Sequence, residues 1–123
     1  RMAAQGQAYQ SPFTGLTGFV YVGDVAEILC QAMLEDFQGA PVINMPGITA
    51  TVEDFILEIK NQMPDAILSS EGSPLPVFAK IPTEFSWSLS NNHEPTPLRT
   101  GIANTLEYYK PGNVNPQNSD DLL

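Results

Sequence analysis

Positively charged residues are scarce in this chain. It holds 5 Lys and Arg against 14 Asp and Glu among 123 residues, which gives a net charge of −9. Nucleic acids and anionic membrane surfaces are bound through clustered cations, and no such cluster is present. No apolar run approaches the ~20 residues of a membrane span, and no signal peptide is recognisable. The composition therefore argues against nucleic-acid-binding and membrane proteins.

Cysteine and histidine are nearly absent as well. Cys30 is the single cysteine, which excludes an internal disulfide and fits a reducing compartment, so we expect a cytoplasmic protein. We interpret Cys30 as an inert thiol, because no base stands near it in the sequence. His93 is the single histidine and has no cysteine near it, so we predict no metal site and interpret it as a solvated loop residue. The acidic residues are dispersed, with no pair placed for glycosidase chemistry.

The length corresponds to one domain, and a chain of this size buries roughly two-thirds of its unfolded surface. We expect residues 1–110 to form an α/β domain and residues 111–123 to form a polar, acidic tail that composition predicts to be disordered. The chain begins with Arg1 and Met2 in the middle of a pattern, which suggests a fragment.

The first half predicts a strand that runs into a helix. Residues 19–22 are β-branched and aromatic, and residues 8–10 could pair with them as a small hairpin. Asp24 with Glu27 resembles a capping box, so we predict an N-cap at Asp24 and a helix over 24–36 that stops near Gly39. Its apolar positions recur at helical spacing: Val25, Ile28, Leu29, Ala32 and Met33.

The second half predicts a strand over 41–45, a helix that begins at Thr51 and ends before Pro64, and a strand over 66–70. Thr51 and Asp54 have the spacing of a capping box, and the apolar stripe of this helix would consist of Val52, Phe55, Ile56 and Ile59. Residues 71–82 suggest an extended surface segment, and residues 83–89 fit a strand or a short helix. A last helix is predicted to be capped by Thr96. Its inner face would consist of Leu98, Ile102, Thr105, Leu106 and Tyr109.

Four segments occur in an order that resembles a known enzyme family. They are the stretch that leads from Gly6 to Gly15, F-V-Y-V-G-D-V-A over 19–26, G-A-P-V-I-N over 39–44 with T-V-E-D over 51–54, and P-T-P-L-R-T-G-I over 95–102. Together they resemble the second half of the extended short-chain dehydrogenase/reductases, the NAD-dependent epimerase/dehydratase family. The resemblance covers roughly residues 5–110.

This resemblance implies an α/β fragment of that fold, with three main helices, a few short strands and no Rossmann core. The missing N-terminal half would bind NAD or NADP and would be this chain's partner. The chain has no G-x-x-G-x-x-G motif, and Tyr109 with Lys110 lacks the Y-x-x-x-K spacing. We therefore predict no catalytic, cofactor-binding or metal-binding residues here, and no activity of the chain alone.

The implied substrate is a sugar, a sugar acid or another small hydroxy compound. Relatives that bind nucleotide sugars carry Arg-Asp before the F-V-x-V strand, where this chain has Thr17 and Gly18, and the downstream cation is only Lys80. By resemblance, the candidate substrate-binding residues are Tyr9, Phe13, Thr17, Phe19, Tyr21 and Lys80. Two interpretations of the hairpin residues stay open, pocket lining and plain packing, and Asp24 could likewise be a ligand instead of a cap.

Two functions from different classes follow. The chain is the substrate-binding portion of an NAD(P)-dependent sugar or nucleotide-sugar epimerase, dehydratase or dehydrogenase, or it is a non-catalytic α/β interaction module. Without a cofactor half, the strand at 42–44 and the apolar face of helix 24–36 would be bare, so we expect a homodimer.

Overall fold

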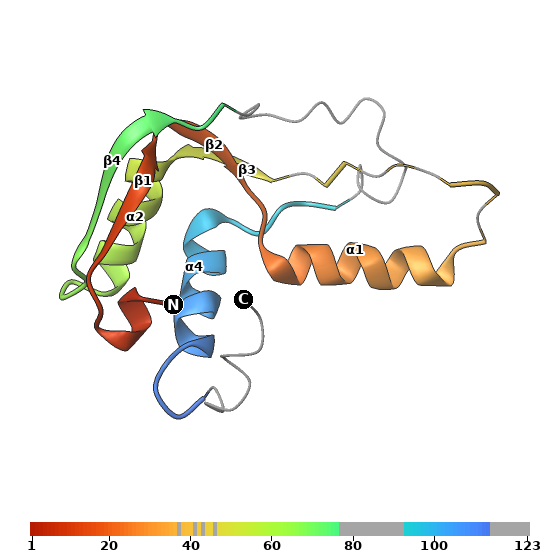
Figure 1. Ribbon diagram of the computed structural model, residues 1–123. Coiled ribbons are helices and arrows are strands. Elements are labelled where there is room, and N and C mark those ends of the chain that lie inside the picture. Colours follow the sequence, from red (N-terminus) through yellow and green to blue (C-terminus); the bar gives the residue numbers. More distant parts are fainter. Residues whose placement is uncertain (37, 41, 43, 46, 77–92, 114–123) are drawn as a thin grey trace.

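The computed structural model describes residues 1–36, 38–40, 42, 44–45, 47–76 and 93–113. It is a mixed α/β structure with three α-helices among these residues (Figure 1). The elements are a 3₁₀ turn η1 (Ala3–Gln5), β1 (Tyr9–Thr14), β2 (Leu16–Phe19), α1 (Val22–Leu34), β3 (Ile48–Thr51), α2 (Val52–Gln62), β4 (Leu68–Pro74) and α4 (Leu98–Tyr108). The mixed fold class with a few short strands is confirmed.

Strands β1 and β4 form a parallel pair that lies along one side of the molecule (Figure 1). The register shifts between Ser11 and Phe13, which places Pro12 at an irregularity where its missing N–H costs no ladder hydrogen bond. Gly72 faces this point with a φ of 140°, and a Cβ there would lie 2.1 Å from the Pro12 carbonyl oxygen. Glycine at 72 is what lets the two backbones approach so closely.

Strands β2 and β3 form a separate antiparallel pair, with Leu16 opposite Thr51 and Phe19 opposite Ile48. The predicted hairpin is therefore wrong, because β1 and β2 are consecutive but do not pair with each other, and each pairs with a strand further along the chain. The predicted strand at 19–22 is also misplaced. The strand lies at Leu16–Phe19, and helical geometry begins at Val22.

Helix α2 connects the two strand pairs, and its start was predicted correctly. The Thr51 side chain accepts the Asp54 backbone N–H at 2.9 Å, and the Asp54 carboxylate accepts the Thr51 N–H at 3.2 Å. Glu53 then reaches the turn between β1 and β2, where it accepts the Gly15 N–H at 3.2 Å. The helix ends at Gln62, as the proline at 64 predicts.

The core lies where η1, β4 and α4 meet α2. Its buried residues are Ala3, Ala4, Leu68, Ile102 and Leu106, and partly buried side chains of α2 and α4 pack against them. Three of the predicted apolar positions of α2, namely Phe55, Ile56 and Ile59, belong to this layer, and so do Leu98 at the start of α4 and Tyr109 at its C-cap. The predicted inner faces of both helices are thus confirmed.

Helix α1 extends away from this core (Figure 1). Its predicted apolar stripe divides: Ile28 is fully buried, whereas Leu29 and Met33 are exposed, Met33 to 84%. The helix ends at Leu34 and not near Gly39. Of the predicted strand at 41–45, the described residues Val42, Asn44 and Met45 adopt no strand, and the other two lie outside the described residues.

Three further predictions fall outside the described residues. They are the secondary structure of 83–89, the greater part of the tail and the position of Lys80. The segment 71–82 is described only as far as 76, and residues 71–74 belong to β4.

Candidate binding site

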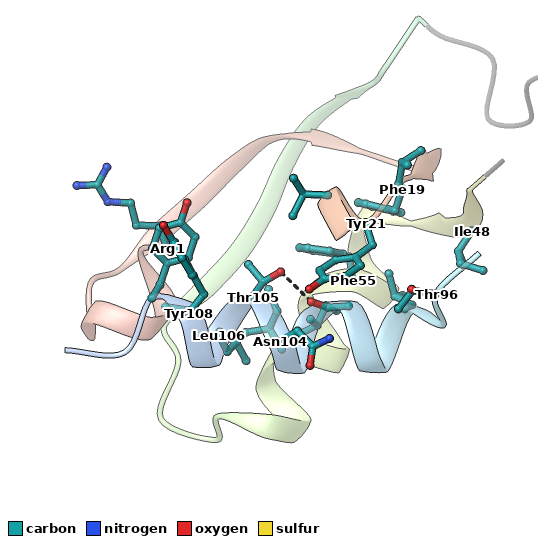
Figure 2. A pocket seen from close by; sticks show the side chains of 18 residues that line it. Arg1, Phe19, Tyr21, Ile48, Phe55, Thr96, Asn104, Thr105, Leu106 and Tyr108 are labelled. Carbon is teal, nitrogen blue, oxygen red and sulfur yellow. Dashed lines mark hydrogen bonds between the residues drawn. The ribbon is translucent and has the colours of Figure 1, made fainter. Parts of the chain in front are cut away.

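A cavity of about 750 Å³ lies between α4, α2, η1 and the adjoining ends of β2 and β3 (Figure 2). Its size falls within the range of small-molecule sites, ~300–1,000 Å³. The described residues that line it are Arg1, Ala3, Phe19, Val20, Tyr21, Val22, Ile48, Phe55, Ile59, Thr96, Leu98, Gly101, Ile102, Asn104, Thr105, Leu106, Tyr108 and Tyr109. Most of this lining is apolar or aromatic, so a ligand in the cavity would be held mainly by the burial of apolar surface, with few polar contacts.

Tyr21 lies at the centre of the lining, at the residue where the chain turns from β2 into α1 (Figure 2). Two glycines make room for its ring. A Cβ at Gly23 would lie 2.4 Å from Tyr21 Cε1, and a Cβ at Gly101 would lie 3.3 Å from Cδ2. The ring is therefore held between the first turns of α1 and α4, and any side chain at 23 would force it to move.

Phe19 and Phe55 form a second aromatic wall. Their ring centroids lie 4.6 Å apart with an interplanar angle of 5°, which is a stacked pair. Phe19 ends β2 and Phe55 lies in the second turn of α2, so the stack joins the antiparallel strand pair to the helix beside it. Aromatic pairs of this kind are worth ~0.5–1.5 kcal/mol beyond the area that they bury.

The polar groups of the lining are few and mostly uncharged. Thr105 donates its hydroxyl hydrogen to the Gly101 carbonyl oxygen at 2.7 Å, so its oxygen keeps lone pairs that can accept a hydrogen bond. Asn104 is exposed on the same helix. None of the described lining residues is Asp or Glu, and Arg1 is the one cation among them (Figure 2).

Asp24 lies just beyond the cavity and joins α1 to the segment that precedes α4. Its carboxylate accepts the Thr96 backbone N–H at 2.9 Å and the Thr96 hydroxyl at 2.5 Å. The side chain of Asp24 is buried, and so is the imidazole of His93, whose Nε2 lies 3.3 Å from Asp24 Oδ1. That contact is within ion-pair distance but is not aligned as a hydrogen bond, and Nε2 has no hydrogen-bond partner among the described residues.

Two opposing effects act on the Asp24 carboxyl. Burial raises its pKa, but the hydroxyl and backbone hydrogen bonds from Thr96 and the adjacent His93 ring outweigh burial and hold the pKa below its ordinary value. Asp24 is therefore ionised at neutral pH, and the buried charge is stabilised by groups 72 residues away along the chain.

Three sequence-based interpretations of this region are wrong. Asp24 is not the N-cap of α1, because the helix begins two residues earlier and its N-cap is Tyr21. Thr96 is not the N-cap of α4, which is Pro97, since the Thr96 hydroxyl is engaged by Asp24 instead. His93 is not solvated, because its side chain is only 9% exposed and packs against Asp24.

The structure brings together two of the six predicted substrate-binding residues, Phe19 and Tyr21. Thr17 is buried in β2 outside the described lining, and Tyr9 and Phe13 are about half exposed on β1, also outside it. Lys80 lies outside the described residues. The sequence reading missed Phe55, Gly101 and Thr105, although Phe55 and Thr105 stood in the predicted inner faces of their helices.

Within the described part of the chain, no three His, Cys, Asp or Glu side chains are grouped to hold a metal ion. None of the described helices has both the length and the apolar content to cross a membrane. In comparisons with known proteins, the chain matches no family model, no curated protein and no solved structure.

Proposed function

We propose that the chain is the substrate-binding portion of an NAD(P)-dependent epimerase, dehydratase or dehydrogenase, and that a dinucleotide-binding half packs against α1. The substrate would be a small hydroxy compound bound in the cavity beside Tyr21. The chain itself would supply no cofactor contacts.

The observation that carries this proposal is the uncovered apolar face of α1. Leu29 is 53% exposed and Met33 is 84% exposed, although both belong to the apolar stripe of the helix. A helix with such a stripe normally buries it against a second element. In the family that the sequence resembles, the corresponding helix packs on the sheet of the cofactor domain, which is the kind of surface this stripe would fit.

Asp24 supports the same proposal. It fixes the N-terminal end of α1 to the segment before α4 through two hydrogen bonds with Thr96. The helix therefore points away from the core in a defined direction, and its apolar face with Leu29 and Met33 is exposed to solvent. The cavity also begins at the same junction, because Tyr21 and Val22 line it.

The test begins with the reading frame upstream of Arg1. A G-x-x-G-x-x-G motif and a Y-x-x-x-K motif there would support the proposal, and the longer protein would then be titrated with NAD and NADP by calorimetry. Hydrogen exchange at the amides of α1 should slow in the longer protein relative to the 123-residue chain measured at a dilution where that chain is monomeric. A frame without either motif, or equal exchange at α1 in both proteins, would overturn it.

The second candidate is a non-catalytic interaction module, favoured by the same bare face of α1. The two functions differ in what lies upstream and in cofactor binding. If no dinucleotide motif is encoded and a protein partner protects α1 from exchange, the module is the better account.

A further inference from the structure

The cavity beside Tyr21 is nearly free of charge in a strongly acidic protein. The chain carries a net charge of −9, yet none of the described lining residues is Asp or Glu. Its one cation, Arg1, lies next to Tyr108 at the end of the cavity away from Phe19 and Tyr21 (Figure 2). An anionic ligand would thus find no cluster of cations in the cavity and would meet a negative potential outside it.

The walls of the cavity are suited to a flat ring. Phe19 and Phe55 are stacked at 4.6 Å, and the Tyr21 ring is held between Gly23 of α1 and Gly101 of α4. At the other end, the rings of Tyr108 and Tyr109 meet edge to face with centroids 5.0 Å apart. Aromatic rings pack favourably against other aromatic side chains, in offset-stacked or edge-to-face arrangements.

The hydrogen-bonding groups of the lining are hydroxyls and an amide. Thr105 and Thr96 each donate to another protein group and keep lone pairs to accept a hydrogen bond, and Asn104 can both donate and accept. These groups can satisfy one or two hydroxyls of a ligand. A sugar would bring many more hydroxyls, and most of them would face apolar side chains such as Ile48, Leu98 and Ile102 without a partner.

We infer that this cavity binds an uncharged, flat ligand of the hydroxylated aromatic class, in preference to a sugar diphosphate. Only the identification of this ligand as the substrate of a longer enzyme rests on the proposed function. Binding itself is a property of the described residues and can be measured on the 123-residue chain.

The experiment titrates the chain by calorimetry at pH 7 with three probes: 2-naphthol, the 2-naphthoate anion and UDP-glucose. We expect saturable binding of 2-naphthol, at least tenfold weaker binding of 2-naphthoate, and no saturable binding of UDP-glucose. Saturable UDP-glucose binding tighter than that of 2-naphthol would overturn the inference, and so would the absence of 2-naphthol binding.

A matched pair of variants localises the site. Val20 lines the cavity and is 42% exposed, so Val20→Trp places a large ring at its wall and should weaken 2-naphthol binding at least tenfold. Leu57 is exposed on α2 outside the described lining, so Leu57→Trp should leave the affinity within twofold. Equal affinities of the two variants would place the ligand elsewhere and overturn the inference.

A second measurement needs no variant. Intermolecular nuclear Overhauser effects should connect the protons of 2-naphthol with the ring protons of Tyr21 and Phe55. Contacts with Leu29 and Met33 of α1 in their place would show adsorption to the bare helix face and would contradict the inference. The proposed function is tested separately, by the motifs encoded upstream of Arg1. A failure of that proposal can therefore be distinguished from a failure of 2-naphthol to bind in the cavity.

Discussion

Replacement of Asp24 tests how the two halves of the chain are joined. In Asp24→Ala the Thr96 N–H and hydroxyl lose their acceptor, and the buried His93 ring loses the carboxylate that lies 3.3 Å away. Hydrogen bonds to a charged group contribute about 1.5–3 kcal/mol each, and removal of one partner of a buried set leaves the others unpaired. We expect a loss of about 3 kcal/mol in the free energy of unfolding, several times more than the ~1 kcal/mol of a lost N-cap.

The assay is urea unfolding followed by circular dichroism at a fixed protein concentration. Asp24→Asn keeps one acceptor oxygen but turns an amide N–H toward other donors, so it should lose about 1–2 kcal/mol. The control is Asp65→Ala, which removes an exposed carboxylate of the same kind and should change the free energy of unfolding by less than ~0.5 kcal/mol. Equal unfolding free energies for Asp24→Ala and Asp65→Ala would refute the reasoning.

The same carboxylate makes stability depend on pH in a defined direction. The folded pKa of Asp24 lies below its unfolded value, so between those two values the unfolded chain binds more protons, and stability rises with pH. The contribution is complete above the ordinary Asp pKa of about 4 and is lost as the pH falls through the folded value. Because hydrogen bonds also lower the pKa of Asp54 and Glu107, the informative quantity is the stability difference between wild type and Asp24→Asn, which should shrink below about pH 4.

Three further predictions follow from other parts of the structure. Thr51→Ala should destabilise the chain by about 1 kcal/mol while Thr51→Ser loses less, because serine restores the cap of α2; equal unfolding midpoints for all three proteins would contradict this. Calorimetry should detect no saturable binding of NAD or NADP by the 123-residue chain, since its sequence has no glycine-rich phosphate turn, and tight binding would overturn the assignment of the cofactor to another half. Light scattering at micromolar concentration should show a dimer formed through the bare face of α1, and Met33→Lys should shift it to monomer; a wild-type monomer would show that this face tolerates water.

The parts of the fold that the sequence predicts correctly depend on local interactions. The cap at Thr51 is made by a residue three positions away, and the apolar face of α2 follows from helical spacing alone. The helix starts that depend on distant partners were predicted incorrectly. Asp24 has the local signature of a cap, but its carboxylate is committed to Thr96, and nothing in the neighbouring residues indicates a partner so far along the chain.

The strands show the same limit. Residues 19–22 have the stronger β-forming character, but the strand lies over 16–19 because it pairs with Ile48–Thr51 and because α1 starts at Val22. The candidate site could be predicted only in part for a related reason. Phe19 and Tyr21 follow from the family resemblance, whereas Phe55 and Thr105 enter the cavity because α2 and α4 pack on either side of it.

The parallel pairing of β1 with β4 sets the order in which this chain can fold. Gln10 and Glu71, which are hydrogen-bonded across the pair, are 61 residues apart, so closing that loop costs about 3–4 kcal/mol in chain entropy. Parallel pairing between such distant residues is slow, whereas α2 with its own capping box can form from neighbouring residues alone. During synthesis, β1 therefore leaves the ribosome long before its partner exists and stays unpaired until Pro74 has emerged. Gln10, Ser11 and the exposed Pro12 lie within β1, and because proline donates no ladder hydrogen bond, the waiting strand is poorly suited to pairing with another copy of itself.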